Sequence, residues 1–526
     1  MTHLPLCLLA LCTASVLPAG KPLVICADAD PDGFDPAQSA NDATLKASAG
    51  RIYNNLIEYA PGPFKFVPAL AERWDISPDG LVYTFHLRHG VAWQRNALFK
   101  PSREFNADDV LWTLQRQIDP AHPGAKAAPA GFPYANAGEW KNLFKSIEKP
   151  DAYTLRLTLN KPFAPLLERF AHPALSIVSA EYGQQLDKAG TPTLLASQPI
   201  GTGPYQMTNF DKGAQLRYEA NPQYWRHKPA IERLIVATVP DPAVRAQKLL
   251  AGECQLADTI KPQDLPRFSG NASFVATPLR MQASAQLTFN VGKKPMDDKR
   301  VRQALAMAID RAAIVKVVYD GRAEVGSSPY AARSLWGSEA VKAAEPDLAQ
   351  AKKLLAEAGY PNGFELELWS RAGGSFTNPN FPLTAQLIQA DWAKLGVRLK
   401  LVTMDWVELI KKARAGAAPA LLTGWSGALD PDGFYSNQAS CDATHNGYNF
   451  AQWCHPRAEA ALDAGRLATS IASRSPHYIE LQKLIADEVP FTTLAYPVPV
   501  VIHSRSLGGV EPTAGDSFKV EQLFWR

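Results

Sequence analysis

The second half of the chain alternates short apolar runs with longer stretches in which apolar residues recur every three or four positions. The short runs are residues 364–369, 397–401 and 418–423, and the stretches between them are residues 382–395 and 406–415. Short apolar-rich runs are typical of buried strands, whereas a period near 3.6 is typical of helices with one buried face. The order strand, helix, strand, helix, strand predicts an α/β unit with a largely parallel sheet.

Further elements are predicted on the N-terminal side of this unit. Residues 81–87 and 153–159 alternate apolar and polar positions, which is the pattern of half-buried strands. Apolar spacing predicts helices over residues 43–57 and 301–318, and a third helix begins at Asn106 or Ala107, where acidic residues favour a helix start.

The ends of the three predicted strands carry unusual side chains. Gly424, Trp425 and Ser426 follow the last apolar run, Trp406 follows the second, and Arg371 follows the first. Open parallel sheets bind ligands at the carboxyl ends of their strands. A pocket lined by these residues is one interpretation, and packing of the tryptophans in the core is the other.

Residues 424–427, Gly-Trp-Ser-Gly, resemble part of the turn that carries the nucleophile of serine hydrolases. That turn requires Gly-x-Ser-x-Gly, and here the fifth position is Ala428. The sequence shows no catalytic triad, metal-binding cluster or phosphate loop. A strand that ends in an ordinary loop therefore explains Ser426 better than catalysis does.

Length and charge narrow the class of protein. A chain of 526 residues is too long for a single core, so two or three domains are expected. The formal net charge of +3 is too small for this length to indicate a nucleic-acid partner, and no run of Lys or Arg is present.

The first 20 residues are predicted to be a signal peptide. Residues 4–17 are apolar, too short to span a bilayer, and followed by small residues suited to cleavage near Ala19 or Gly20. The preceding Met-Thr-His lacks the usual Lys or Arg. No later stretch is apolar enough for a membrane span, so a soluble exported protein is expected.

Four of the six cysteines remain after removal of the signal peptide, and an even number in an exported chain predicts two disulfides. Four cysteines allow three pairings. Cys441 with Cys454 closes a short loop, a bond that stabilises by about 3 kcal/mol on the chain-entropy model, and this leaves Cys26 with Cys254. No Cys-x-x-Cys occurs and the ten histidines are scattered, which disfavours a zinc site.

An ordered set of motifs resembles the peptide/nickel class of substrate-binding proteins of ABC importers. The set covers almost the whole mature chain and consists of residues 33–36, 68–74, 83–91, 105–110, 200–205, 293–295 and 301–305. Residues 389–394 and 448–454 are similar to the dipeptide-binding members, and the four cysteines fall where those members have disulfides.

The resemblance implies an α/β, two-lobed periplasmic-binding-protein fold, type II-like, with a hinge between the lobes. Lobe I would comprise residues 21–279, with an inserted subdomain, and residues 499–526; lobe II would comprise residues 280–498. Ligand contacts to both lobes would stabilise a closed form, with no covalent chemistry and no cofactor.

The resemblance also places the ligand site. An acidic residue that pairs with the amino group of a dipeptide matches Ala428, and an arginine that holds the carboxylate matches Ser375. Both charges are absent, so an ordinary dipeptide is expected to bind poorly. Arg371, Asp430 and Asp432 are candidates to replace them. Trp406, Trp425, Thr377 and Ala40 match other pocket positions, and the small size of Thr377 and Ala40 indicates a roomier or differently shaped site.

The expected function is therefore that of a monomeric periplasmic receptor in a Gram-negative bacterium, handing a peptide or peptide-like ligand to an inner-membrane permease. Modified peptides, opine-like conjugates, metallophores and haem are further ligand classes to consider. The alternative is a receptor subunit for chemosensing, which the sequence alone does not distinguish from an importer receptor.

Overall fold

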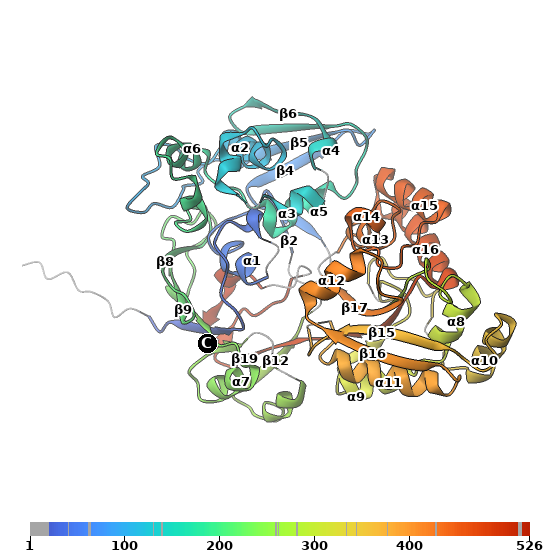
Figure 1. Ribbon diagram of the computed structural model, residues 1–526. Helices are drawn as coiled ribbons and strands as arrows, with labels where there is room; N and C mark the ends of the chain where they lie inside the picture. The colour runs from blue at the N-terminus through green and yellow to red at the C-terminus, as the bar shows by residue number, and fades with distance from the viewer. Residues whose placement is uncertain are drawn as a thin grey trace, which may run out of the picture.

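The computed structural model describes residues 20–39, 42–60, 65–129, 131–137, 140–257, 260, 262–279, 282–332, 334–342, 345–375, 377–426, 429–513 and 518–526. Two large sheets form the centres of two lobes, which lie side by side in Figure 1. Their apolar cores are separate clusters of buried residues. The molecule is thus a mixed α/β protein, as predicted.

The first lobe contains a seven-stranded sheet in the order β12-β19-β11-β1-β10-β9-β8. Its strands are β1 (Leu23–Ala27), β8 (Tyr205–Asp211), β9 (Gln215–Ala220), β10 (Arg233–Thr238), β11 (Leu256–Ala257), β12 (Phe274–Pro278) and β19 (Val500–Ser504). The Cys26–Cys254 disulfide joins β1 to the segment preceding β11, as predicted.

A second sheet of four strands belongs to the same lobe, in the order β4-β5-β7-β6. These strands are β4 (Ala71–Ile76), β5 (Val82–Leu87), β6 (Phe144–Asp151) and β7 (Thr154–Leu159). Tyr83, Phe85 and Leu87 of β5 point into the core, which confirms the half-buried strand predicted from alternation. The short strand pairs are β2 (Ile57–Tyr59) with β3 (Phe66–Pro68), and β20 (Leu507–Gly508) with β21 (Phe524–Trp525).

The helices before residue 280 lie mostly around this second sheet (Figure 1). They are α1 (Asp42–Ser48), α2 (Ala107–Ile118), α3 (Pro133–Ala137), α4 (Trp140–Leu143), α5 (Leu166–Ala171), α6 (Ala180–Lys188) and α7 (Pro242–Leu250). Asn106 caps α2, as predicted, by accepting a hydrogen bond from the Asp108 amide.

The second lobe contains a six-stranded sheet in the order β14-β18-β13-β17-β15-β16. Its strands are β13 (Ala283–Phe289), β14 (Ala323–Val325), β15 (Glu365–Arg371), β16 (Arg398–Met404), β17 (Ala420–Ser426) and β18 (Phe491–Pro497). The three strands predicted from the apolar runs are β15, β16 and β17, and they pair in parallel. The sheet is nevertheless mixed, because β13 runs antiparallel to both β17 and β18.

The helices of the second lobe are α8 (Lys299–Met307), α9 (Arg311–Val318), α10 (Leu348–Glu357), α11 (Phe381–Ala393), α12 (Trp406–Arg414), α13 (Pro431–Gln438), α14 (Ala443–Asn446), α15 (Pro456–Leu467) and α16 (Ile471–Glu488). The Cys441–Cys454 disulfide joins the segment before α14 to the segment before α15. This pairing also agrees with the prediction.

Two predicted helices are wrong in extent. The helix expected over 301–318 is interrupted after Met307, because Asp310 caps a new helix by accepting from the Ala313 amide. The helix expected over 43–57 ends at Ser48, and β2 begins at Ile57. In both places apolar residues beyond the helix end are buried by neighbouring elements. The apolar spacing typical of a helix therefore continues past the residue at which the helix ends.

The chain passes between the two large sheets twice, from β12 to β13 and from β18 to β19. Both connections are short, since Pro278 is followed by β13 at Ala283 and Pro497 by β19 at Val500. The lobes are therefore joined by two short segments that lie next to each other in the fold.

Candidate functional site

The three predicted strand ends meet at one edge of the six-stranded sheet. Arg371, the last residue of β15, pairs with Met404 at the end of β16, and Trp406 opens α12 directly afterwards. Trp425 lies near the end of the adjacent β17. Figure 1 shows this edge, with α12, on the side of the second lobe that faces the first lobe.

Arg371 is a cation that packs against an aromatic ring. Its guanidinium lies 5.3 Å from the centre of the Trp406 ring. Its Nε is buried, and among the described residues it has neither a hydrogen-bond partner nor an acidic ion-pair partner. Partial burial lowers the pKa of Arg371 from its usual value, although the group stays charged at neutral pH. The side chain is thus available to an anionic ligand group.

The two tryptophans of the site differ in exposure. Trp406 is 38% exposed. Trp425 is half-buried, and its ring contacts Phe434 and Tyr448 edge to face, at 5.9 and 5.8 Å between ring centres. The Trp425 Nε1 is buried and has no acceptor among the described residues. Trp425 therefore packs partly into its own lobe, with a donor that no described residue satisfies.

Ser375 and Thr377 bond to each other, and Thr377 lies against Gly424 of β17. The Ser375 hydroxyl accepts a hydrogen bond from the Thr377 amide at 3.2 Å and lies 3.0 Å from the Thr377 hydroxyl. Thr377 is buried against Gly424, where an added Cβ would lie 2.1 Å from Thr377 Oγ1. Gly424 is therefore required by the close approach of this loop.

Three other predicted site residues give less information. Ala40 and Ala428 lie outside the described residues. Ser426 is exposed at the end of β17, and its hydroxyl bonds to no described side chain. Within the part of the chain that is described, nothing activates Ser426 as a nucleophile.

Asp430 and Asp432, considered above as ligand anchors, each form an ion pair with an arginine. Arg474 donates to both oxygens of the buried Asp430 at 2.6 and 2.7 Å. Arg466 donates to Asp432 at 2.5 Å, and Arg169 of the first lobe lies 3.6 Å from the same carboxylate. These two acids therefore hold the structure around α13 together.

Sequence reasoning missed Glu168, which lies on α5 of the first lobe. Its Oε1 accepts hydrogen bonds from the Leu429 and Asp430 amides of the second lobe, at 2.9 and 2.8 Å. Burial and the neighbouring charge of Asp430 raise the pKa of Glu168 to about 8. The only local signal in the sequence is an adjacent Glu and Arg within the apolar stretch 166–171.

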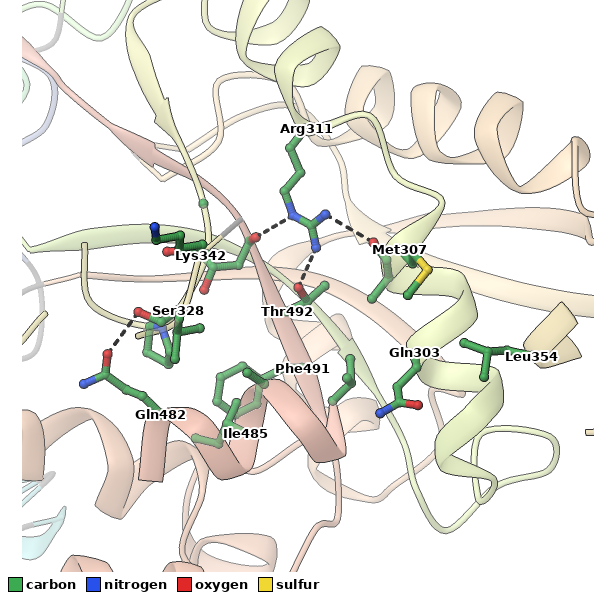
Figure 2. Close-up of a pocket in the computed structure, with 18 of the residues that line it drawn as sticks. Gln303, Met307, Arg311, Ser328, Lys342, Leu354, Gln482, Ile485, Phe491 and Thr492 are labelled. Carbon is green, nitrogen blue, oxygen red and sulfur yellow. Dashed lines mark hydrogen bonds between the residues drawn. The ribbon is translucent and has the colours of Figure 1, made fainter. Parts of the chain in front are cut away.

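A cavity of about 330 Å³ lies elsewhere in the second lobe, among α8, α9, α10, α16 and β18. Figure 2 shows Arg311 on its wall, donating to the Thr492 hydroxyl at 2.8 Å and to two backbone carbonyls. Burial lowers the pKa of Arg311 to about 10. These bonds connect α8, α9 and β18, so Arg311 stabilises the packing of these elements. The cavity is separate from the ends of β15, β16 and β17 described above.

None of the described helices is long and apolar enough to cross a membrane. Among the same residues, no group of three or more His, Cys, Asp or Glu side chains is arranged to hold a metal ion.

The fold and this edge of the sheet define a two-lobed solute-binding protein, and comparison with known proteins specifies the family. Residues 65–446 match the model of bacterial extracellular solute-binding proteins, family 5. The chain is 42% identical to Di/tripeptide-binding protein 4 of Pseudomonas aeruginosa, over 98% of each chain. It is 37% identical to Heme-binding protein A of Haemophilus influenzae, over 90% of this chain and 87% of the relative.

A solved structure supports the same assignment. HbpA2 from Haemophilus parasuis superposes with a TM-score of 0.89 at 36% identity, covering 96% of this chain and all of the other. The chain belongs to family 5 of the bacterial extracellular solute-binding proteins.

Proposed function

We propose that this protein is the periplasmic receptor of an ABC importer in a Gram-negative bacterium, and that it captures a peptide or peptide-like solute by closing its two lobes. The observation that carries the proposal is Arg371, a cation stacked on Trp406 without an acidic partner among the described residues, at the end of β15. In Figure 1, α12, which begins at Trp406, lies on the side of the second lobe that faces the first lobe. A relative whose name describes a di/tripeptide-binding protein supports the ligand class.

Arg371 binds a carboxylate of the ligand in this proposal. A guanidinium donates two parallel hydrogen bonds to a carboxylate, and its contact with Trp406 orients it at little entropic cost. It takes the place of the arginine that family resemblance expects at Ser375. The exposed face of Trp406 and the half-buried Trp425 provide apolar contact for the rest of the ligand.

The remaining parts of the proposal concern organisation. Residues 1–20 act as a signal peptide, residues 21–279 with 499–526 form one lobe, and residues 280–498 form the other. Separate apolar cores and the two short connections between the large sheets support these limits. The receptor acts as a monomer, delivers its ligand to an inner-membrane permease and performs no covalent chemistry.

A second ligand class is favoured by one observation, the relative named Heme-binding protein A. Haem, a metallophore or an opine-like conjugate would present carboxylates to the same Arg371. Mass spectrometry of solute that co-purifies with the native protein distinguishes these ligands from peptides. Importer and chemosensory roles are distinguished by deleting the neighbouring permease and measuring uptake of that solute.

Binding is expected to close the lobes. Addition of saturating Ala-Ala-Ala should reduce the radius of gyration measured by small-angle X-ray scattering, because ligand contacts to both lobes stabilise the closed form. The same peptide should raise the melting temperature by mass action on the native state. A peptide that binds and stabilises the protein while the scattering stays the same would contradict closure.

The Arg371→Ala variant is expected to bind carboxylate-bearing peptides about tenfold more weakly, because a partly exposed charge-assisted contact is lost. Calorimetry should show a much smaller loss for the same peptides with amidated C-termini. Arg398→Ala is the matched control, since Arg398 lies on neighbouring β16 in an exposed pair with Glu365. Equal losses for acid and amide peptides would exclude Arg371 as the carboxylate anchor.

A further inference from the structure

Helix α5 is the part of the first lobe that reaches the loop after β17. Besides the two hydrogen bonds to Glu168, the Ala164 amide just before α5 donates to the Arg466 carbonyl at 2.9 Å. The residues that Glu168 contacts, Leu429 and Asp430, directly follow Ala428 in the chain. Ala428 is the position at which resemblance expects the acid that pairs with a dipeptide's amino group.

Glu168 has hydrogen-bond capacity that none of the described residues uses. The residue is 8% exposed, and both amide donors bond to the same oxygen, Oε1. Its other oxygen has no partner among the described residues. The two neighbouring acids, Asp430 and Asp432, differ from Glu168 because each forms a close ion pair with an arginine.

An ionised carboxylate in such a place favours a cation. Desolvation destabilises the charged form unless an opposite charge lies nearby. Arg169 on the same helix lowers the pKa of Glu168, but burial and the charge of Asp430 outweigh it. Arg169 itself contacts Asp432 and lies over the rings of Tyr134 and Phe163. The other titratable groups around Glu168 are Asp430 and Asp432 at α13, Arg466 on α15, Arg474 on α16, Tyr134 on α3 and Tyr330.

We infer that Glu168 holds a cationic group of the ligand, an amine above all, when the lobes close. This inference rests on the proposed function and adds a specificity determinant to it. The anionic contact that family resemblance expects from residue 428 of the second lobe is supplied here from the first lobe. A zwitterionic ligand then places its carboxylate on Arg371 and its amine on Glu168.

A purely structural role predicts a different response to mutation. If Glu168 only fastens the lobes, it contributes equally to every ligand that closes them. Glu168→Gln separates the two roles, because the amide oxygen can still accept from Leu429 and Asp430 while the charge is removed. Glu148→Gln, on exposed β6 of the same lobe, is the matched control.

The probes are alanine peptides of two to five residues, each with a free or an acetylated amino group, measured by calorimetry. Glu168→Gln is expected to weaken binding of the best free peptide about tenfold to a hundredfold and to leave its acetylated form nearly unchanged. Equal losses for both forms would overturn the inference and assign Glu168 a fastening role. If free and acetylated peptides bind the unmutated protein equally while the lobes close, only the inference fails. If none of these peptides binds, the peptide ligand of the proposed function is wrong as well.

Proton counting gives a second readout. At pH 7 a closed complex without a cation should keep Glu168 protonated, whereas a ligand ammonium should keep it ionised. Binding of the acetylated peptide should therefore take up nearly one proton more from solution than binding of the free peptide does. Calorimetry in phosphate and Tris buffers measures this difference, which Glu168→Gln should abolish. A difference that survives the substitution would contradict the inference.

Discussion

Replacement of Arg474 by alanine is expected to destabilise the second lobe by about 3–5 kcal/mol, because it leaves the buried Asp430 carboxylate without its counter-charge. Arg474 donates to both oxygens of Asp430 and also to the Tyr478 hydroxyl, at 2.9 Å. Both side chains of the pair are at most 6% exposed. Urea unfolding followed by tryptophan fluorescence measures the change.

Two further variants test this explanation. Arg457→Ala breaks an exposed pair with Glu480 on the adjoining helices and should cost less than about 1 kcal/mol. The double variant Asp430→Asn with Arg474→Met should recover part of the loss, because it removes both charges of this pair and leaves neither one buried without its partner. If Arg474→Ala costs no more than Arg457→Ala, the buried pair does not stabilise the lobe as argued.

Ordinary dipeptides are expected to bind this protein about a thousandfold or more weakly than they bind a relative that carries both charges at the positions of Ala428 and Ser375. Glu168 and Arg371 offer charges of the correct signs, but from other positions. A dipeptide such as Ala-Ala has a fixed short separation between its amine and carboxylate. We therefore expect a dipeptide not to engage both displaced charges at once, and a longer or modified ligand to do so.

Calorimetry with Ala-Ala, side by side with such a relative, measures the difference. Ala428→Asp with Ser375→Arg should restore some binding of the dipeptide. Restoration is expected to be partial, because the Ser375 hydroxyl also stabilises the turn with Thr377. Micromolar or tighter binding of Ala-Ala to the unmutated protein would show that Arg371 and Glu168 fit a dipeptide after all.

Local sequence patterns predicted an element correctly where the buried residues recur with the period of a single helix or strand. The runs at 364–369, 397–401 and 418–423 became β15, β16 and β17, because apolar residues of each run are buried in the sheet, among them Leu368 of β15, Leu399 of β16 and Leu422 of β17. The same patterns failed at Met307 and Ser48. There the chain stays buried while its direction changes, and periodicity alone does not report a change of direction.

The sequence by itself determined the family, through its ordered motifs, and also the two disulfides, the parallel strands of the second lobe and the residue types at their ends. It also identified Arg371 and Trp406 as candidates, because the ends of parallel strands meet at one edge. Only the tertiary structure decided which charged side chains are already paired within the protein. In the sequence, Asp430 and Asp432 do not differ from other acidic residues. In the structure, each pairs with an arginine, 44 and 34 residues further along the chain. Glu168 meets the Asp430 amide across 262 residues and two lobes, and no local pattern encodes a contact between elements so far apart.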